Sequence, residues 1–333
     1  MKQLAYLNLS TTDPDFNLAA EEYVFDALPR NRNYCMLWQN DRAIIIGKHQ
    51  NTLAEINQPY VEQNGIRVVR RLSGGGAVYH DLGNLNFTFI ADAQNAEEIN
   101  FSLFCQPVLR TLEALGVNAQ VNGRNDMTID GKKFSGNSQY LRDGRVMHHG
   151  TILFDSDLQV VSQALQVDPE KIRAKGIQSV RSRVTNVRPC LPRDITLAQF
   201  RQLLLQEILR QNGGEEYRFN EEDLAAIEER RSRRYGTWQW NYGESLVCTL
   251  VKRRRFEGCG TVEAYLDVEQ GVIRSVAFRG DFFSPRDPEE LARCLVGLRP
   301  ERQEYEQALQ IAEAGRYFVG LNNEQLLELL CEG

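Results

Sequence analysis

The N-terminal part of the chain contains short apolar runs with two different periods, that of a β-strand and that of an α-helix. Leu4 to Leu9 predicts a first strand, and Asp13-Pro14 predicts a helix N-terminus, with a capping aspartate before proline at the first helical position. Residues 34–38 and 43–46 are short apolar runs on either side of a polar turn. These runs predict a sheet with one face of a helix packed on it.

The same periods continue through the middle of the chain. Helices are expected over 101–115 and from Thr196 to Gly213, and a strand over 148–154. Asp130-Gly131 stands between two short alternating runs, which is a strong signal for a hairpin that places Lys133 on the return strand. A further helix, from Asn220 through the charged run 228–234, is expected to carry its charges on a solvated face and not to be a binding patch.

The C-terminal quarter has a pattern of its own. Val262 to Val268 alternates, a Glu-Gln-Gly turn follows, and 272–278 returns as a second strand before Asp287-Pro288 caps the first of three helical runs. We therefore predict an α+β protein with a large mixed-sheet domain over 1–243 and a small α+β accessory domain over 246–333.

Composition and charge exclude several classes of protein. The chain has 333 residues, a net charge of -6 and a pI near 5.5, which argues against binding nucleic acid through bulk charge. Its seven cysteines are scattered without a C-x-x-C pair and indicate free thiols in a reducing compartment. No apolar leader follows Met1 and no run reaches membrane-span length, so we expect a cytoplasmic protein without a membrane partner.

Candidate chemistry concentrates in the stretch from Arg70 to Ile90. Three glycines, Gly74 to Gly76, stand between two predicted strands, where the missing Cβ atoms let backbone amides approach an anionic ligand. Arg70 and Arg71 add positive charge beside them. A simple hairpin turn needs neither three glycines nor an arginine pair, and the spacing fits neither a Walker loop nor a dinucleotide fingerprint. The pattern favours a ligand cradle of a different kind.

The stretch resembles the signature of the lipoate-protein ligases, within the superfamily of biotin and lipoate protein ligases. The matching positions run without a gap and are Arg70, Arg71, Gly74, Gly75, Gly76, Val78, Tyr79, His80, Asp81, Gly83 and Asn84. The resemblance covers nearly the whole length, and it implies a large catalytic domain of the biotin/lipoate ligase type followed by the small accessory domain.

The resemblance also implies roles for individual residues. Lys133 is the lysine expected to contact both the acyl carboxylate and the adenylate phosphate. The remaining expected contacts fall into three groups: Arg71, Gly76, Ala77, Val78 and Tyr79 for ATP or adenylate; Gly74, Gly75 and His149 for lipoate; and Lys175, Gly176, Ser179 and Arg181 on a loop that orders over the adenylate.

On spacing alone, several of these residues would have purely structural roles. Lys133 would be a solvated hairpin lysine, and His149 and His80 would be neutral, hydrogen-bonded strand histidines. Asp126 is a candidate Mg²⁺ ligand, although an Asn-Asp pair before a hairpin is about as often a turn residue.

The expected activity is ATP-dependent activation of free lipoate, or octanoate, followed by transfer to a lysine of an acceptor protein. ATP and Mg²⁺ would be co-substrate and metal, and no tightly bound prosthetic group is predicted. The implied acceptors are lipoyl domains of 2-oxoacid dehydrogenases and the glycine-cleavage H protein. Two alternatives stay open: an octanoyl transferase that works without ATP through a cysteine, for which Cys105 and Cys190 are the nearest candidates, and a non-catalytic lipoyl-binding module.

Overall fold

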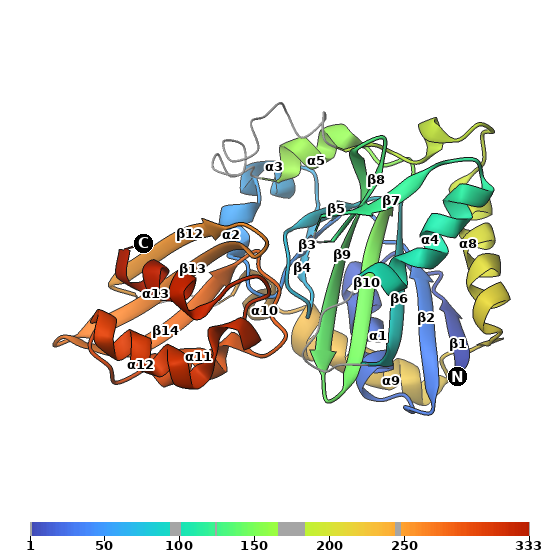
Figure 1. Ribbon diagram of the computed structural model, residues 1–333. Helices are drawn as coiled ribbons and strands as arrows, with labels where there is room; N and C mark the ends of the chain where they lie inside the picture. Colours follow the sequence, from blue (N-terminus) through green and yellow to red (C-terminus); the bar gives the residue numbers. More distant parts are fainter. Residues whose placement is uncertain (1, 94–100, 124, 166–183, 244–247, 333) are drawn as a thin grey trace.

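A computed structural model describes residues 2–93, 101–123, 125–165, 184–243 and 248–332 of the chain. Figure 1 shows two lobes, a larger one built from the chain up to α10 (Trp238–Tyr242) and a smaller one that begins at β12 (Leu250–Phe256). The α+β class predicted from the sequence is confirmed.

A mixed eight-stranded sheet forms the centre of the larger lobe, in the order β11-β1-β2-β6-β10-β9-β8-β7. Strands β11, β1 and β2 run parallel, and every later pair is antiparallel. The strand bounds are β1 (Gln3–Asn8), β2 (Arg32–Trp38), β6 (Asn84–Asp92), β7 (Ala119–Asn122), β8 (Asp126–Ile129), β9 (Lys132–Arg142), β10 (Arg145–Leu153) and β11 (Glu215–Glu216).

A separate three-stranded sheet has the order β4-β3-β5, with bounds Ala43–Ile46 for β3, Arg67–Arg70 for β4 and Val78–His80 for β5. The central strand β3 is parallel to β4 and antiparallel to β5. The glycine-rich segment 71–77 therefore joins the two edge strands across β3. This arrangement agrees with the prediction that the segment is not a simple hairpin turn.

Helices cover the two faces of the large sheet in different ways (Figure 1). α4 (Ser102–Ala114) and α8 (Leu197–Asn212) pack on one face through a cluster that includes Phe87, Val108 and Leu204. α1 (Pro14–Asp26) and the small sheet cover the other face. The outer side of the small sheet is covered by two short helices, α3 (Gln58–Gln63) and α5 (Leu158–Ala164), and by Ile56, which follows the short helix α2 (Thr52–Glu55).

Helix α1 is enclosed on nearly all sides. Asp13 caps it as predicted, since its carboxylate accepts from the backbone N–H groups of Asp15 and Phe16 at 2.9 and 3.3 Å. Eleven of its thirteen residues are buried, because the sheets lie on one side and the helical segments α9 (Glu221–Arg230) and η2 (Arg231–Tyr235) lie on the other.

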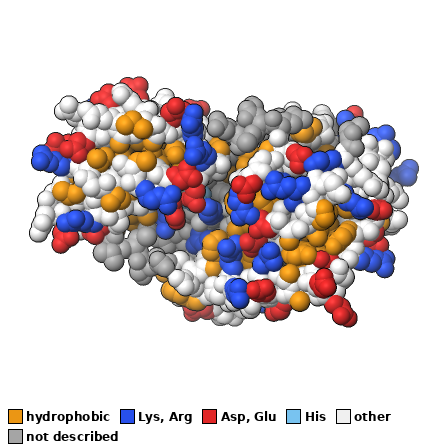
Figure 2. Space-filling model, turned by 90° about the horizontal axis from the view of Figure 1, so that it is seen from below, with side chains coloured by type: hydrophobic (Ala, Val, Ile, Leu, Met, Phe, Trp, Pro, Cys, Tyr) orange, Lys and Arg blue, Asp and Glu red, His pale blue; other side chains and the backbone are white. Residues whose placement is uncertain are grey.

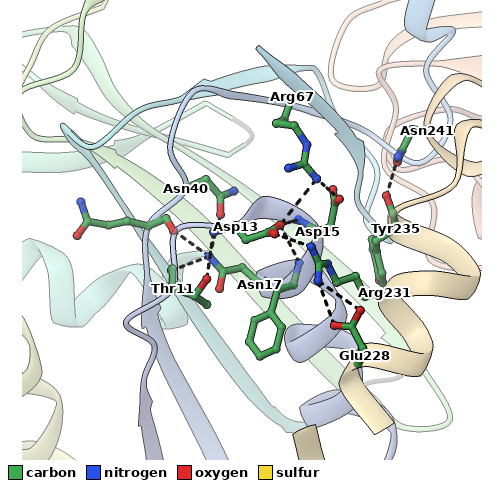
Figure 3. Close-up of polar contacts among 12 residues, drawn as sticks. Thr11, Asp13, Asp15, Asn17, Asn40, Arg67, Glu228, Arg231, Tyr235 and Asn241 are labelled. Atoms are coloured by element: carbon green, nitrogen blue, oxygen red, sulfur yellow. Dashed lines mark hydrogen bonds and ion pairs between the residues drawn. The ribbon is translucent and has the colours of Figure 1, made fainter. Parts of the chain in front are cut away.

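The charged run 228–234 does more than face solvent, so the prediction of a solvated charged face is wrong for part of it. Figure 3 shows Arg231 reaching both Glu228 and the cap residue Asp13, with Nη2 2.7 Å from Asp13 Oδ2. On the opposite side of the cap, Arg67 of β4 pairs with Asp15. These ion pairs join the N-terminus of α1 to β4 and η2.

The smaller lobe is an antiparallel sheet in the order β12-β13-β14 with helices packed on it. Within the described part of the chain, no helix combines the length and the apolar character needed to cross a membrane. Residues 244–247 lie outside the described residues, so the domain boundary after 243 stays a prediction. The bounds of the remaining elements are η1 (Arg188–Cys190), α10 (Trp238–Tyr242), β12 (Leu250–Phe256), β13 (Gly260–Glu269), β14 (Val272–Gly280), α11 (Pro288–Leu295), α12 (Arg302–Ala312), η3 (Ala314–Arg316) and α13 (Asn323–Glu332).

Three buried histidines make stability depend on pH. Burial lowers the pKa of His49 and of His148 well below the ordinary value, and lowers the pKa of His80 to about 3. Below pH 6.5 the unfolded chain therefore binds protons that the folded chain does not. We expect the free energy of unfolding to fall between pH 7 and 5.5, by up to about 1.4 kcal/mol per pH unit for each histidine.

Urea unfolding at both pH values measures this loss. His148→Gln removes one of the three groups and should give a shallower slope than the wild type, whereas equal slopes would contradict the assignment.

Candidate active site

A cavity of about 110 Å³ lies between the large sheet and the small sheet of the larger lobe. Its walls come from both sheets, the glycine-rich segment and α1. The lining residues are Leu18, Trp38, Ile45, Arg71, Gly75, Gly76, Ala77, Val78, His80, Asn86, Asn125, Lys133, Gly136, Asn137, Ser138, His149, Gly150 and Thr151.

The cavity extends across four strands of the large sheet. Trp38 of β2 pairs with Asn86 of β6, and Asn86 pairs with Thr151 of β10. Thr151 Oγ1 accepts from the backbone N–H of Gly136 on β9 at 3.2 Å. Three interstrand steps of about 4.8 Å give a length of about 14 Å. One end therefore holds the ammonium of Lys133 and the other is walled by Trp38 and other large apolar side chains.

Lys133 occupies the position that the hairpin signal predicts. The turn before it, Asp130-Gly131, has φ values of 49° and 74°, which fits a two-residue hairpin loop. The pairing of β8 with β9 shifts register so that Phe134 is an extra residue between two paired ones. The Lys133 ammonium then lies 2.7 Å from Asp126 Oδ1 and directly over Gly136, where an added Cβ would stand 3.0 Å from Nζ.

Replacing Gly136 by alanine should displace that ammonium by a few tenths of an ångström. We expect kcat for the adenylate formation that the sequence resemblance implies to fall about tenfold, because a small misplacement of a charge-stabilising group is costly. Stability should change little, since the end of the lysine side chain can move. Gly315→Ala in the smaller lobe, where the new Cβ would meet the nearest atom at 3.4 Å, is the matched control and should leave kcat unchanged.

Arg71 braces the glycine-rich segment from within. Its guanidinium donates to the carbonyl oxygens of Gly74 and Gly76 at 2.7 and 2.9 Å, to that of Ile45 at 3.1 Å, and to Ser73 Oγ at 3.1 Å. Burial lowers the pKa of Arg71 to about 10, so the side chain stays charged near neutral pH. It contributes positive potential to the cavity while most of its donors hold the backbone.

Arg70 has a different role from the one its position beside the glycines suggested. Its guanidinium donates to the carbonyl oxygens of Gly47, Lys48 and Gln50 at 2.9, 3.1 and 2.7 Å, and to Thr52 Oγ1 at 2.7 Å. Arg70 therefore fixes the segment between β3 and α2, and it is not among the residues that line the cavity.

At two of the three glycines, the missing side chain leaves room for residues of the smaller lobe. The Gly75 amide, at φ 90°, donates to the Phe282 carbonyl oxygen at 3.1 Å. A Cβ on Gly74 would stand 2.4 Å from that same oxygen, and one on Gly75 would stand 2.8 Å from the Phe283 ring. Only Gly76 has open space where a Cβ would be, with no atom within 4 Å. The missing side chains thus serve contact between lobes as well as any ligand.

A buried hydrogen-bonded chain surrounds His149. Its Nε2 is 2.6 Å from Ser73 Oγ, and its Nδ1 is 2.9 and 3.0 Å from the two carboxylate oxygens of Glu21. Thr88 donates to Glu21 Oε1 at 2.6 Å, and Trp38 donates to Thr88 Oγ1 at 2.9 Å. Glu21, Ser73 and Thr88 are not among the site residues predicted from the sequence. The one available signal was an acidic residue that follows Leu18-Ala19-Ala20 directly in α1.

The structure brings together most of the predicted site residues. Arg71, Gly75, Gly76, Ala77, Val78, Lys133 and His149 all line the cavity, and Asp126 reaches it through Lys133. The side chain of Tyr79 is buried in the cluster beneath α3 and α5. Lys175, Gly176, Ser179 and Arg181 lie outside the described residues.

Gly74 instead lines a second cavity, of about 450 Å³, between the β9–β10 hairpin and residues 284–290 of the smaller lobe. Figure 2 shows side chains of both charges along the furrow between the lobes. The charged residues of this cavity are Lys48, Arg142, Asp143, Arg145, Arg286, Asp287 and Glu290.

The cysteines lie away from the first cavity, whose lining residues include none. Cys105 is buried in α4, and burial raises its pKa to about 12, so its thiol is unreactive near neutral pH. Cys190 lies half-buried at the end of η1. A cysteine nucleophile therefore has no support at the cavity wall.

Comparison with known proteins gives the family. Residues 13–209 match the lipoyl protein ligase A/B catalytic domain, and residues 245–330 match the bacterial lipoate protein ligase C-terminus. The chain is 43% identical to lipoate-protein ligase LplJ of Bacillus subtilis, over 97% of this chain and 98% of that one. It is 41% identical to lipoate–protein ligase 1 of Staphylococcus aureus, with the same coverage.

Comparison with solved structures leads to the same family. LipL1 of P. falciparum in complex with lipoate superposes with a TM-score of 0.79 at 24% identity and 98% coverage of both chains, which supports the fold of both lobes. A bi-partite lipoate protein ligase of Thermoplasma acidophilum, described with its E2 lipoyl domain, gives 0.64 at 28% identity over 75% of this chain and all of that one. Lipoate-protein ligase A bound with ATP gives 0.61 at 26% identity, over 73% and 98%.

The resemblance noted in the glycine-rich stretch and the fold that it implied are thus confirmed, and the chain belongs to the lipoyl protein ligase A/B family.

Proposed function

We propose that this protein is an ATP-dependent lipoate-protein ligase. It activates free lipoate with ATP to lipoyl-AMP, releasing pyrophosphate, and then transfers the lipoyl group to a lysine of an acceptor protein. One observation carries the proposal. A single cavity contains Lys133 at one end, the backbone of Gly75 to Val78, and an apolar slot lined by Leu18, Trp38 and Ile45. The curated relatives that bear this activity in their names match nearly the whole chain.

The first half-reaction brings two anions together. The lipoate carboxylate attacks the α-phosphorus of ATP, and the bond to the pyrophosphate leaving group breaks. Positive charge must be fixed where the two anions meet, because their approach is otherwise repulsive. The Lys133 ammonium can supply that charge at the cavity end opposite Trp38, and Arg71 adds to the positive potential from beneath the glycine-rich segment.

The second half-reaction needs no nucleophile from the enzyme. The acceptor lysine amine attacks the carbonyl carbon of the mixed anhydride, AMP leaves, and the amine loses a proton as the amide forms. This chemistry is compatible with a cavity wall that has no cysteine among its lining residues. We propose lipoyl domains of 2-oxoacid dehydrogenases and the glycine-cleavage H protein as acceptors, in line with the E2 lipoyl domain named with the Thermoplasma ligase.

Magnesium would enter with ATP as part of the substrate. Among the residues that the structure describes, no group of three or more His, Cys, Asp or Glu side chains could hold a metal ion. A single carboxylate fits Mg²⁺ that is already coordinated by phosphates. Asp126 is the candidate for this contact, and its Oδ1 would have to exchange the Lys133 ammonium for the ion.

Pyrophosphate release without any acceptor tests the proposal. Purified protein with lipoate, ATP and Mg²⁺ should release about one equivalent of pyrophosphate per active site and then slow, because the adenylate waits for its acceptor. Adding a lipoyl domain should restore turnover and increase the mass of the domain by one lipoyl group.

The alternatives give other results in the same assay. If no pyrophosphate appears but an octanoyl-carrier protein donates its acyl group without ATP, the protein is a transferase. If lipoate binds and neither reaction occurs, the protein is a binding module, and the ligase proposal fails in both cases.

A further inference from the structure

His80 lies on the cavity wall far from Lys133. It is the last residue of β5 and is 3% exposed, and its ring meets the Trp38 ring edge-on with centroids 6.3 Å apart. Trp38 marks the β2 end of the slot, three strands away from the Lys133 end. A chain that places its carboxylate at Lys133 therefore ends near His80.

The surrounding amides fix which ring nitrogen of His80 carries the proton. Asn17 Nδ2 lies 3.2 and 2.8 Å from the backbone oxygens of Thr11 and Gln39 and 2.9 Å from Asn40 Oδ1, and it shares its two hydrogens among these three acceptors. The Asn40 amide nitrogen then faces His80 Nδ1 at 3.1 Å. Since that nitrogen can only donate, Nδ1 is the acceptor and the hydrogen is on Nε2.

The Asn86 amide adds a second donor on the same edge of the ring. Its Oδ1 accepts from Asn84 Nδ2 at 2.8 Å, which leaves Asn86 Nδ2 directed to His80 Nδ1 at 3.5 Å. In this arrangement Asn86 donates to the same ring nitrogen as Asn40, which agrees with the tautomer that the Asn17–Asn40 contact fixes. Burial, with the charge of Arg71 as a smaller cause, lowers the pKa of His80 to about 3, so the ring stays neutral.

The Nε2–H donor has no protein partner in the part of the chain that the structure describes, although it is fully buried. An unsatisfied buried donor destabilises the fold, and proteins rarely leave one without a purpose. Besides Asn86, the side chains that line this end of the cavity include Leu18, Trp38 and Ile45, which are largely apolar. A ligand group that accepts a weak hydrogen bond from within an apolar ring would suit this place.

We propose that His80 is a specificity-determining residue that donates its Nε2–H to a sulfur of the lipoyl dithiolane ring. The inference rests on the proposed function and deepens it. Lipoate and octanoate have the same carboxylate and a similar chain, but octanoate ends in a methyl group that cannot accept a hydrogen bond. A site built to donate to a substrate atom discriminates against an analogue that lacks it. His80 therefore favours lipoate over octanoate.

His80→Phe keeps an aromatic ring and removes the donor. Equilibrium binding of lipoate and of octanoate, measured by calorimetry without ATP, should show weaker lipoate binding by about two- to tenfold and unchanged octanoate binding. The same change should appear in the ratio of kcat/KM values for pyrophosphate release. Equal losses for both acids would mean that His80 only supports the fold of the cavity and would overturn the proposal.

His148→Phe is the matched control. His148 is also buried and neutral, but both of its ring nitrogens have partners, Gln139 Nε2 at 2.9 Å and Asn137 Oδ1 at 3.3 Å, and it is not among the residues lining the cavity. Its replacement should leave the lipoate-to-octanoate ratio unchanged. A ratio that shifts as much as in His80→Phe would overturn the assignment to His80.

A second measurement needs no variant. Wild-type protein should bind lipoate about two- to tenfold more tightly than 5-cyclopentylpentanoate, in which methylene groups replace both ring sulfurs. Equal affinity would overturn the proposal even if His80→Phe failed to fold. Because these binding assays contain no ATP, they decide the role of His80 separately from the ligase activity, whose failure would appear only as absent pyrophosphate release.

Discussion

Replacing Lys133 by methionine should lower the rate of lipoate-dependent pyrophosphate release by about 10²–10³-fold, the usual cost of removing one charge aimed at a reacting centre. Methionine keeps most of the length and volume of the side chain, so the loss would come from the missing ammonium. The ammonium is held 2.7 Å from Asp126 Oδ1 above Gly136, at the end of the slot where carboxylate and α-phosphate would meet. Rapid mixing followed by quenching, with pyrophosphate quantified during the first turnover, measures this decrease in rate.

Lys132→Met is the matched control, because Lys132 is the exposed neighbour on the same strand and does not line the cavity. It should retain the wild-type rate. Unfolding curves of both variants should overlay that of the wild type. If Lys133→Met released pyrophosphate within a few-fold of the wild-type rate, the adenylation chemistry would have to be assigned to other residues.

Replacing Arg70 by alanine should reduce the free energy of unfolding by about 3–5 kcal/mol. Arg70 is 6% exposed, and its guanidinium donates to the carbonyl oxygens of Gly47, Lys48 and Gln50, all of which would lose a charged donor together. It also bonds the backbone oxygen of Trp240 at 2.9 Å, so α10 would be loosened as well.

Urea denaturation of Arg70→Ala beside Arg233→Ala measures this effect. Arg233 has a side chain that is 79% exposed and pairs only within its helical turn, with Glu229, among the ion pairs of the described chain. Its loss should change stability by less than about 0.5 kcal/mol. Comparable effects of the two substitutions would show that the Arg70 hydrogen bonds contribute little net stability.

Local signals in the sequence predicted the individual elements well. Asp13 caps α1, the Asp130-Gly131 turn forms its hairpin, and Thr196 caps α8 with a full capping box. Each of these features is set by a few adjacent residues, whose hydrogen bonds and φ values are settled locally. For the same reason Lys133 was placed correctly on β9.

Pairing between strands could not be predicted in the same way. Residues 34–38 and 43–46 are neighbours in sequence, yet β2 joins β1 and β6 while β3 joins β4 and β5 in another sheet. All four residues of β3 are buried, and a strand buried on both faces shows no alternation from which its partners could be inferred.

The sequence predicted residues of the candidate site that would contact a ligand, but it did not predict the contacts that site residues make with distant parts of the protein. Glycines at 74 and 75 indicated close approach, but the group that approaches is the 282–283 segment of the smaller lobe, about two hundred positions later in the chain. The hydrogen bonds that link Glu21 to His149 and His149 to Ser73 join three segments that are far apart in the sequence. Long-range contacts of this kind depend on the folded arrangement and leave no short motif.

The all-round burial of α1 has a consequence for how the sequence of this protein can vary. In α8, buried Phe200, Leu204 and Ile208 recur at helical spacing, so substitutions should be tolerated at the positions between them. α1 offers no such free face: it carries the cap residue, a wall residue of the cavity in Leu18, and the Glu21 carboxylate beneath His149. In a saturation-mutagenesis library selected for function, tolerance along α8 should rise and fall with each turn, whereas α1 should be intolerant throughout.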